Sequence, residues 1–509
     1  MSVNWPLTTL KKAGINLIDC DHKTPKAQKE GFPYIGIPQL KDGRILLDGA
    51  RLISEADFHH WRRKANPAPD DVILSRRCNP GEMAYVPKNL DIALGQNLVL
   101  LRADGEKVFP PFLRWVSQGS NWWRQVNKYI NVGAVFDSLK CADIPKFEFR
   151  LPPMEDQKRI AKILGDLDKK IELNRQTNQT LENITQAIFK SWFVDFEPTR
   201  AKITAKQEWD KKNLPAKNTQ NMRAAHGAGS GGNDTALSNE QAKEIFVERA
   251  AMAAISGKTL DELDAQGCVN AADAGSAGAA SPEQLERLKT TAALFPDSLV
   301  DSELGEIPEG WELFCLGDVT TELRRGISPK YTEVNGIQVI NQKCIRNHSI
   351  NFELTRLNDL EKRKVEGRKV ELGDVLVNST GVGTLGRLSP VRYLPEPTVF
   401  DSHVTIVRAD KNKISKAFLC GLMLEKEAFI EASGAGSTGQ TELRKQVLED
   451  IQFAMPSINL GEIFEGIVEP INKQIATLEA QQKSLTETRD TLLPKLLSGE
   501  LQIGSEEAA

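Results

Sequence analysis

Hydrophobic residues follow two different periods along this chain, and each period occurs in two separate regions. In about 1–150 and 311–455, short apolar runs are bounded by Gly, Pro, Asn and Asp, which predicts strands. After each region comes a stretch in which apolar residues recur every three or four positions, which predicts a long helix. The pattern therefore predicts an α+β protein in which two β-rich globular units each lead into a helix.

The expected strands and short helices come in the same order in both units. The first unit has strand-like FPYIGI, DVILS and NLVLLRA, followed by the helix-like PPFLRWVSQGSNWWRQV. The second has GIQVI, DVLVNS and HVTIVRA, followed by KAFLCGLMLEKEAFI. The shared order indicates that the second unit repeats the first.

The two halves also match residue by residue, at an offset of 304 positions without a gap. Leu151-Pro152-Pro153 corresponds to Met455-Pro456-Ser457, and Leu139, Ile144, Phe147 and Phe149 correspond to Leu443, Leu448, Ile451 and Phe453. A repeat of this length predicts a duplicated domain with a pseudo-two-fold axis. Such symmetry suits a DNA duplex read at two half-sites. The alternative is a duplicated scaffold that only dimerises with itself.

Each half contains one long helix with an apolar seam. The first helix is expected from about Glu155 to Phe193, and its counterpart lies 304 residues further on. A helix of this size spans about 50 Å, longer than the core of one domain requires. We therefore expect the two helices to form an antiparallel coiled coil. The residues expected to pair are Ile163, Leu167, Ile171, Leu181, Ile188, Ile467, Ile471, Ile475, Leu485 and Leu492.

The same seam contains polar residues, namely Asn174, Asn178 and Thr185. A coiled coil between two copies of the chain is the alternative to pairing within one chain. The polar seam residues do not decide between the two arrangements.

The 509 residues are expected to form two to four domains. Residues 199–300 interrupt the repeat with the low-complexity segments HGAGSGGND and AADAGSAGAASP, on either side of a helical piece around SNEQAKEIFVERAAMAAIS. The expected organisation is a globular domain (1–152), a helical spacer (153–198), a flexible acidic linker with short helices (199–300), a second globular domain (301–455) and a second helical spacer (456–509).

Charge is distributed unevenly along the chain, whose formal net charge is −4. The first globular unit carries +6 and the second +1, whereas residues 195–310 carry −7 and residues 456–509 carry −5. Positive charge therefore lies on the globular units, as attraction to phosphate requires. Because the excess is small, tight binding to DNA would need a basic partner.

The cysteines and histidines predict neither disulfides nor a metal site. Seven cysteines are scattered without CxxC spacing, which fits a reducing cytoplasm. His59 and His60 are adjacent and would point to different faces, while His22, His226, His348 and His403 are isolated in the sequence. No apolar run approaches ~18 residues and no signal peptide is visible, so we expect a cytoplasmic protein without membrane contact.

The motifs of catalysis and nucleotide binding are also missing from the sequence. There is no NPPF-type motif of adenine methylation, only Asn79-Pro80-Gly81, and no GxxxxGK[ST] loop. Gly381, Gly383 and Gly386 match GxGxxG, but the prolines in RLSPVRYLPEPTV forbid the helix that a dinucleotide site needs. We expect a glycine-rich turn there and a non-catalytic chain.

Several segments, taken in order, resemble the specificity subunit of type I restriction-modification systems. They are ILSRRCNPGEMAYVPKNLDIALGQNLVLLRAD, LPPMEDQKRIAKILGDLDKKIELNRQTNQTLENITQAIFKSWFVDFEPTRAK, LFPDSLVDSELGEIPEGWELFCLGDV, GDVLVNSTGVGTLGR, GSTGQTEL and TRDTLLPKLLSGEL. The resemblance covers nearly the whole chain except about 205–290, a region longer than expected in the family.

The resemblance implies two target-recognition domains, each reading one half of a split, asymmetric DNA site. It implies two conserved helical regions that set the spacer between the half-sites and bind two methyltransferase subunits. A restriction subunit with translocase and nuclease activity would join that core. The chain itself would need no cofactor, while the methyltransferase would use S-adenosylmethionine and the restriction subunit ATP and Mg²⁺. The alternatives are an enzyme that both reads and modifies DNA, and a coiled-coil adaptor without a DNA role.

Polar and basic residues in turns beside strands are the expected DNA contacts. Ser75-Arg76-Arg77 follows DVIL and Asn378-Ser379-Thr380 follows DVLV, so both turns should occupy the same place in their units. Arg can pair with guanine, and Asn or Gln with adenine. The full set is Lys23, Lys26, Ser75, Arg76, Arg77, Asn79, Gln96, Arg324, Arg325, Lys330, Asn341, Gln342, Lys343, Asn378, Ser379 and Thr380. For any single residue, phosphate contact is the more frequent role.

Overall fold

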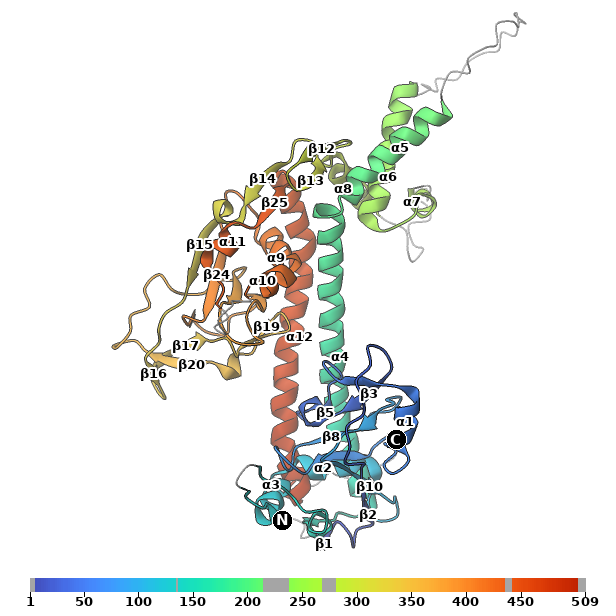
Figure 1. Cartoon of the computed structure of the whole chain (residues 1–509). Helices are drawn as coiled ribbons and strands as arrows, with labels where there is room; N and C mark the ends of the chain where they lie inside the picture. The colour runs from blue at the N-terminus through green and yellow to red at the C-terminus, as the bar shows by residue number, and fades with distance from the viewer. Residues whose placement is uncertain (1–4, 134–135, 214–237, 268–280, 435–441, 502–509) are drawn as a thin grey trace, which may run out of the picture. The chain divides into compact units, whose positions relative to one another are not determined.

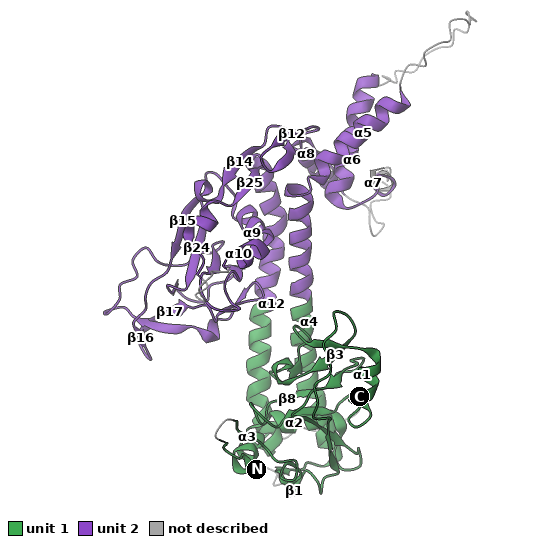
Figure 2. Cartoon of the chain, in the orientation of Figure 1, with its two compact units in different colours: residues 1–176, 479–509 green, residues 177–478 purple. Residues whose placement is uncertain are grey.

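The computed structural model describes residues 5–133, 136–213, 238–267, 281–434 and 442–501 (Figure 1). The chain forms two compact units, residues 1–176 with 479–509, and residues 177–478 (Figure 2). Two long helices, α4 (Met154–Phe193) and α12 (Ile458–Ser498), contribute one half of their length to each unit. Each unit therefore combines a β-rich globular part with half of each long helix.

The globular part of the first unit is built on an antiparallel sheet with the strand order β2-β10-β7-β8. A sheet of order β6-β3-β9 and the pairs β1-β11 and β4-β5 complete it. The strands are β1 (Leu7–Thr9), β2 (Ile15–Asp19), β3 (Phe32–Ile35), β4 (Leu40–Lys41), β5 (Arg44–Ile45), β6 (Arg51–Ile53), β7 (Val72–Ser75), β8 (Met83–Tyr85), β9 (Ala93–Leu94), β10 (Leu98–Ala103) and β11 (Glu148–Arg150). The helices are α1 (Glu55–Arg62), α2 (Pro110–Gln118) and α3 (Ser120–Tyr129).

The second unit repeats this plan. Its sheets have the orders β15-β24-β21-β22 and β16-β20-β17-β23, and its strand pairs are β14-β25, β18-β19 and β12-β13. The strands are β12 (Leu299–Ser302), β13 (Gly305–Pro308), β14 (Glu312–Cys315), β15 (Thr320–Arg325), β16 (Tyr331–Thr332), β17 (Gly336–Ile340), β18 (Ile345–Arg346), β19 (Ser349–Ile350), β20 (Arg356–Asp359), β21 (Val375–Asn378), β22 (Leu388–Pro390), β23 (Thr398–Phe400), β24 (Val404–Ala409) and β25 (Gln452–Met455). The helices are α9 (Lys416–Glu425), α10 (Glu427–Ser433) and α11 (Lys445–Glu449).

Matching side-chain contacts confirm the duplication. Arg102 forms a bidentate ion pair with Asp71 in the first unit, with N···O distances of 2.8 and 2.6 Å. Arg408 forms the same pair with Asp374 in the second, at 2.8 and 2.7 Å. The parallel strand pairs β3-β9 and β17-β23 recur as well. The sequence repeat therefore corresponds to a repeated fold, as predicted.

The long helices fill equivalent places in the two hydrophobic cores. In the first unit Ile160 and Leu164 of α4 are buried beside Leu493 and Leu496 of α12. In the second unit the equivalent residues, 304 positions away, are Phe464 and Val468 of α12 with Phe189 and Trp192 of α4. Each globular part thus packs on the start of the helix that follows it and on the end of the other helix.

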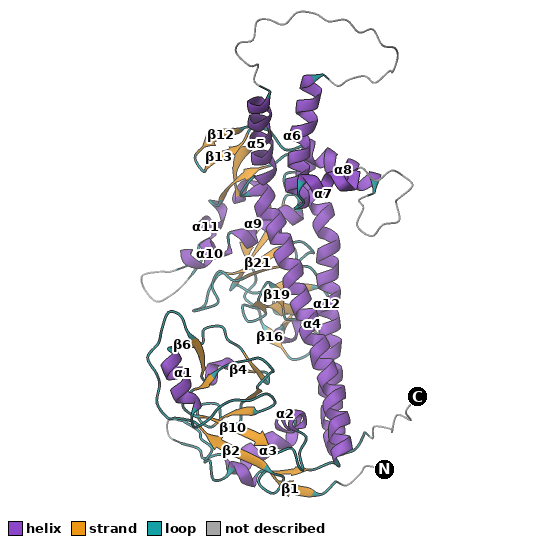
Figure 3. Ribbon diagram, turned by 90° about the vertical axis from the view of Figure 1, so that its right-hand side faces the viewer, coloured by secondary structure: helices purple, strands orange, loops and turns teal. Residues whose placement is uncertain are grey.

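In each unit α4 and α12 lie side by side (Figure 3), and hydrogen bonds between them show that they pair antiparallel within one chain. In the first unit Asn174 Nδ2 donates to Gln481 Oε1 at 3.3 Å. In the second unit Asn178 Nδ2 donates to the carbonyl oxygen of Ile475 at 3.4 Å. Within the first unit Asp168 also pairs with Arg489, so residue numbers rise along α4 as they fall along α12. The helices therefore pair within the chain and not between two copies.

The most buried face of each helix differs from the predicted seam. Of the ten residues expected to pair, Ile171 and Ile475 are buried, with 8% and 1% of their surface exposed. The other eight are only partly buried: Ile163, Leu167, Leu181, Ile188, Ile467, Ile471, Leu485 and Leu492. The spacing of apolar residues predicts which side of a helix is buried but not which residues are buried most. This is because each helix is covered by the globular parts in addition to the partner helix.

Between the two repeats the described residues form packed helices, α5 (Glu197–Lys212), α6 (Asn239–Ser256), α7 (Leu260–Gly267) and α8 (Pro282–Ala293). Trp209 of α5 lies against Phe246 of α6 with ring centroids 5.5 Å apart. The expected helical piece corresponds to α6. HGAGSGGND, nearly all of AADAGSAGAASP, His226 and Cys268 lie outside the described residues. Among the described helices, none is long and apolar enough to cross a membrane.

Candidate nucleic-acid interface

Three turns meet at one end of the β15-β24-β21-β22 sheet in the second unit. The amide of Ser379, after β21, donates to the carbonyl oxygen of His403, before β24, at 2.8 Å. Asn378 Nδ2 donates to the carbonyl oxygen of Gln342, after β17, at 3.1 Å. Polar residues distant in sequence thus share one edge, which we call the loop edge of the second unit (residues 341–343, 378–381 and 401–403).

The first unit has an equivalent loop edge (residues 36–37, 75–77 and 95–97). The amide of Arg76 donates to the carbonyl oxygen of Asn97 at 2.8 Å, as Ser379 does to His403. The amide of Leu139 bonds to the carbonyl of Arg76, and that of Leu443 bonds to the carbonyl of Ser379, at 2.9 and 2.8 Å. The prediction that the two turns occupy the same place in their units is confirmed.

Three of the predicted DNA contacts are interior residues. Ser75, Asn378 and Ser379 have 0% of their surface exposed. The Ser75 hydroxyl donates to the carbonyl oxygen of Arg77 at 2.9 Å, and the Ser379 hydroxyl lies 2.5 Å from that of Thr405. The expectation that these side chains face DNA is therefore corrected, because they shape the turns from inside. A strand that ends in polar residues does not reveal which of them point inward.

The other predicted residues of the first unit lie at the surface. Lys23, Lys26, Arg77, Asn79 and Gln96 are exposed. Arg76 is the exception. Its side chain is only 12% exposed and its Nη2 lies 3.7 Å from an oxygen of Asp19. Arg76 is thus held within the fold, whereas Arg77 extends from the same turn.

Both predicted arginines of β15 are engaged within the second unit. Arg324 pairs with Glu322 at 2.7 Å and also bonds to the carbonyl oxygen of Gly367. Arg325 pairs with Glu442 at 2.5 Å and bonds to the carbonyl oxygen of Leu443 at 3.1 Å. Since these contacts already use their guanidinium groups, binding to DNA would have to compete with them.

The turn after β17 supplies one structural residue and two accessible ones. Asn341 Nδ2 donates to the carbonyl oxygen of Leu354 at 3.1 Å, and Asn341 Oδ1 accepts from the amide of Lys343 at 2.9 Å. Gln342 is half-buried, whereas Lys343 is exposed, as is Lys330. Asn341 therefore stabilises the turn, whereas Lys343 is accessible to solvent and Gln342 is partly accessible.

His403 lies in this edge but was not predicted as a DNA contact. It is exposed, and its Nδ1 lies 2.8 Å from the Thr380 hydroxyl. Thr380 in turn donates to Gln342 Oε1 at 3.3 Å. His403 is isolated in the sequence, and its only signal is a polar position directly before the strand VTIVRA.

The glycine-rich segment 381–386 forms the turn between β21 and β22, as predicted, and opens no helix. Gly381 has φ = +105°, and a Cβ there would meet the side chains of Thr384 and Gln342. This turn, with Arg387 and Glu431, lines an open surface pocket of about 440 Å³. Gly381 thus permits the close approach that brings Gln342 to the turn.

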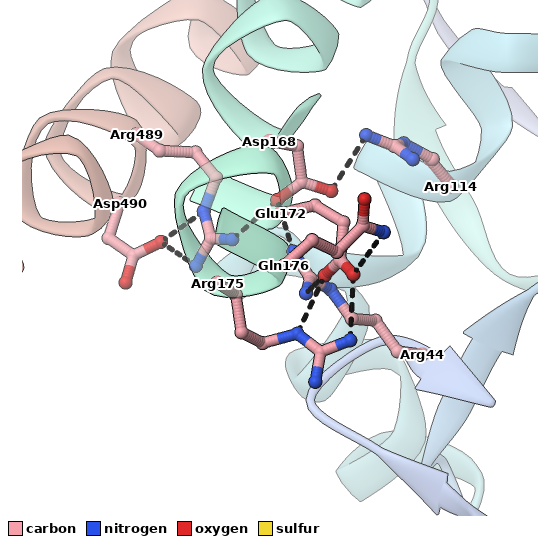
Figure 4. A network of polar contacts seen from close by, with 8 residues as sticks. All are labelled: Arg44, Arg114, Asp168, Glu172, Arg175, Gln176, Arg489 and Asp490. Carbon is pink, nitrogen blue, oxygen red and sulfur yellow. Dashed lines mark hydrogen bonds and ion pairs between the residues drawn. The ribbon is translucent and has the colours of Figure 1, made fainter. Parts of the chain in front are cut away.

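A buried carboxylate ties the first globular part to both helices (Figure 4). Asp168 of α4, whose side chain is 9% exposed, lies 3.0 Å from Arg114 of α2 and 2.8 Å from Arg489 of α12. Arg44 of β5 approaches Asp168 at 3.4 Å and Glu172 at 2.7 Å. Asp168 therefore joins α4 to α2, α12 and β5. The spacing of apolar residues along α4 did not predict this role.

Glu182 of α4 has a comparable role in the second unit. It pairs with Arg392 at 2.8 Å, and both side chains are 8% exposed. Arg392 also bonds to Asn472 of α12 at 3.2 Å. His348 lies 3.6 Å from Glu182 and 2.6 Å from Glu427. Hydrogen bonds to Glu182 and Glu427 raise the pKa of His348 to about 9, against the effect of burial.

The structure brings together one group of potential metal ligands among the residues it describes. Asp19, Cys20 and His22 have ligand atoms within 4.8 Å of one another. However, Asp19 already faces Arg76 and Lys64 at 3.7 and 3.8 Å. Burial raises the pKa of the Cys20 thiol to about 11, which keeps the sulfur protonated. We assign no metal to this group.

Comparison with known proteins gives a consistent family. A family model described as the type I restriction modification DNA specificity domain matches residues 18–183 and 308–487. The specificity subunit of the type I restriction enzyme HindI from Haemophilus influenzae is 27% identical over 464 residues, which are 87% of this chain and 89% of the relative. The MjaIX specificity subunit from Methanocaldococcus jannaschii is 26% identical over 74% of this chain and 66% of its own length.

A crystal structure of a type I restriction-modification S subunit from M. genitalium is similar over 97% of this chain and 96% of its own, with 13% identity and a TM-score of 0.44. The family of this chain is assigned from the family model and the sequence relatives. They exclude the alternative that the chain is a coiled-coil adaptor that does not read DNA. Since the two matched segments cover more than half of the sequence, the chain belongs to the type I restriction-modification DNA specificity family.

Proposed function

We propose that this non-catalytic specificity subunit reads a split DNA site with its two loop edges, one half-site for each globular part. The proposal rests on the equivalent turns of the two units, which have the same backbone hydrogen bonds but different side chains. The hydrogen bonds of the two turns match, whereas Ser75-Arg76-Arg77 in one unit stands where Asn378-Ser379-Thr380 stands in the other. A common frame with different polar groups is what two different base sequences require.

The accessible residues of the loop edges and of the neighbouring turns would make these contacts. In the loop edges they are Arg77 and Gln96 in the first unit and Gln342, Lys343 and Thr380 in the second, and outside the edges they are Lys23, Lys26, Asn79 and Lys330. Lysines on a flexible stem suit phosphate, whereas Arg, Asn and Gln can also read base edges. Arg76, Arg324, Arg325, Asn341 and the buried serines and asparagine would act by holding the turns.

The paired helices would set the spacer between the half-sites and dock two methyltransferase subunits. This is supported by the continuity of α4 and α12 through both compact units. S-adenosylmethionine would bind to the methyltransferase partners, and ATP and Mg²⁺ to restriction subunits. The assembly would work on cytoplasmic DNA. The positive charge of the two globular units is small and the net charge of the chain is −4, which agrees with a need for basic partners.

Domain exchange tests the proposal. The chain is produced with its methyltransferase partner, and residues 1–150 are replaced by the corresponding residues of a relative. Methylome sequencing should show that one half of the modified site changes while the other half and the spacer remain. Changes in both halves would contradict independent reading, and a wild-type assembly without site-dependent methylation would contradict the function itself.

A further inference from the structure

Gln342, Thr380 and His403 contact one another in the loop edge of the second unit, and their contacts indicate which atoms donate hydrogen bonds and which accept them. The hydroxyl oxygen of Thr380 lies 3.3 Å from Gln342 Oε1 and 2.8 Å from His403 Nδ1. A carbonyl oxygen can only accept, so with the Gln342 amide in this orientation the single hydroxyl hydrogen of Thr380 points to Gln342. The hydroxyl oxygen then accepts a hydrogen from His403 Nδ1.

This arrangement determines which atoms remain for a ligand. With the hydrogen on Nδ1, the neutral tautomer of His403 presents Nε2 as an acceptor on an exposed ring. Gln342 uses its oxygen toward Thr380, so its Nε2 amide remains a donor, and no partner for it is found among the described residues. The edge therefore offers one donor and one acceptor, on two side chains that both contact the hydroxyl of Thr380.

The four bases differ in what they present to such a pair in the major groove. Adenine offers N7 as an acceptor beside the N6 amino group as a donor. Guanine offers two acceptors, so the acceptor nitrogen of His403 would face O6 without a hydrogen between them. Cytosine offers only a donor, and thymine an acceptor beside a methyl group. Only adenine satisfies both groups at once.

We infer that Gln342, Thr380 and His403 form an adenine-reading unit in the second globular part, with the Gln342 amide donating to N7 and His403 Nε2 accepting from N6. Thr380 touches no base and is a positioning residue that orients both. This inference rests on the proposed function, since it assigns a base to one half-site. The first unit has Arg77 and Asn97 where the second has Thr380 and His403, so its edge would read a different base.

The test uses the whole chain assembled with its methyltransferase partner and duplexes that carry the site found by methylome sequencing. Each adenine in the second half-site is replaced in turn by 7-deazaadenine, which lacks the N7 acceptor. At one position the wild-type assembly should bind about fivefold to 150-fold more weakly, the range expected when the donor of Gln342 is left without a partner in the interface. The Q342A assembly should be insensitive to the same replacement. If that variant does not fold, the isosteric Q342E, which lacks the donor, takes its place.

A second pair of measurements addresses His403. Replacement of the same adenine by purine, which lacks the N6 amino group, should weaken binding by the wild-type assembly and not by H403A. K343A is the matched control, because Lys343 is exposed in the same turn but has no part in the polar unit. It should retain sensitivity to both replacements.

The outcomes separate the inference from the function on which it rests. If the wild-type assembly is insensitive to 7-deazaadenine at every adenine, or the replacement costs as much in the Gln342 variant as in the wild type, the adenine-reading unit is wrong while site-dependent binding stands. If the wild-type assembly binds all duplexes alike, the proposed function fails first.

Discussion

At the scale of single residues, the loop edges show that neighbouring residues of one turn have opposite roles. Arg76 is largely buried beside Asp19, and its Nε has no hydrogen-bond partner in the described part of the chain. Arg77, the next residue, is exposed. The turn therefore presents one guanidinium to solvent and keeps the other inside.

This contrast gives the first prediction. R77A should weaken DNA binding by about 1 to 3 kcal/mol and relax preference at one position of one half-site, if Arg77 contacts a base. Its folding stability should stay unchanged because the side chain is exposed. R76A should instead lower the melting temperature. Binding measured over several salt concentrations checks the role, since an equal loss on all sequences with a smaller salt slope would make Arg77 a phosphate anchor.

His348 gives a prediction about pH. Its pKa is raised to about 9 in the folded chain from an ordinary value of 6.5, through hydrogen bonds to Glu182 and Glu427. A raised pKa contributes stability that is fully present below pH 6.5 and is lost as pH rises through 9. The wild type should therefore exceed H348Q in unfolding free energy by on the order of 3 kcal/mol at low pH. Urea unfolding between pH 6 and pH 10 measures the difference, and a constant difference would refute the assignment.

At the scale of elements, the long helices are held to the globular parts by charge as well as by apolar packing. Asp168 and Glu182 lie at buried positions of α4, where the apolar period alone predicts hydrophobic residues. Each meets at least one arginine from a globular part, Arg114 or Arg392. Buried ion pairs are weak evidence for net stability, but the loss of one partner is costly.

We therefore expect D168N to lower the unfolding free energy by about 3 kcal/mol, because Arg44, Arg114 and Arg489 would lose their shared carboxylate. D166N is the matched control. Asp166 is exposed on the same helix and pairs with Lys162 and Lys169. Chemical unfolding of both variants checks the prediction, which equal effects of the two substitutions would contradict.

At the scale of the whole molecule, the paired helices lead to a prediction about DNA spacing. Four residues inserted in α4 after Asn178, and four in α12 after Ile475, would lengthen the pair by ~6 Å with little rotation of the seam. We expect the spacer of the methylated site to grow by about one or two base pairs, while both half-sites stay the same. Two-residue insertions would turn each seam by about 200° and abolish activity. Methylome sequencing reads the result, and an unchanged spacer in the active four-residue variant would exclude a ruler.

The sequence by itself determined the elements and their repetition. The periods of apolar residues predicted α4 as about Glu155 to Phe193, where the structure has Met154–Phe193. They also located the central strands of both units, and the glycines at 381, 383 and 386 with the prolines after them predicted the turn at 381–386. These features depend on local propensity and on burial of one face, which the order of residues along the chain expresses directly.

Only the tertiary structure decided which polar residues meet. His403, Thr380 and Gln342 come from three turns, and Asp168 meets arginines from three other elements. Likewise, Ser379 and Thr380 are adjacent in sequence, yet the side chain of Ser379 is buried and that of Thr380 is partly exposed. Side-chain direction at a strand end depends on the twist and pairing of the sheet around it. For that reason the recognition surface is a property of the assembled fold.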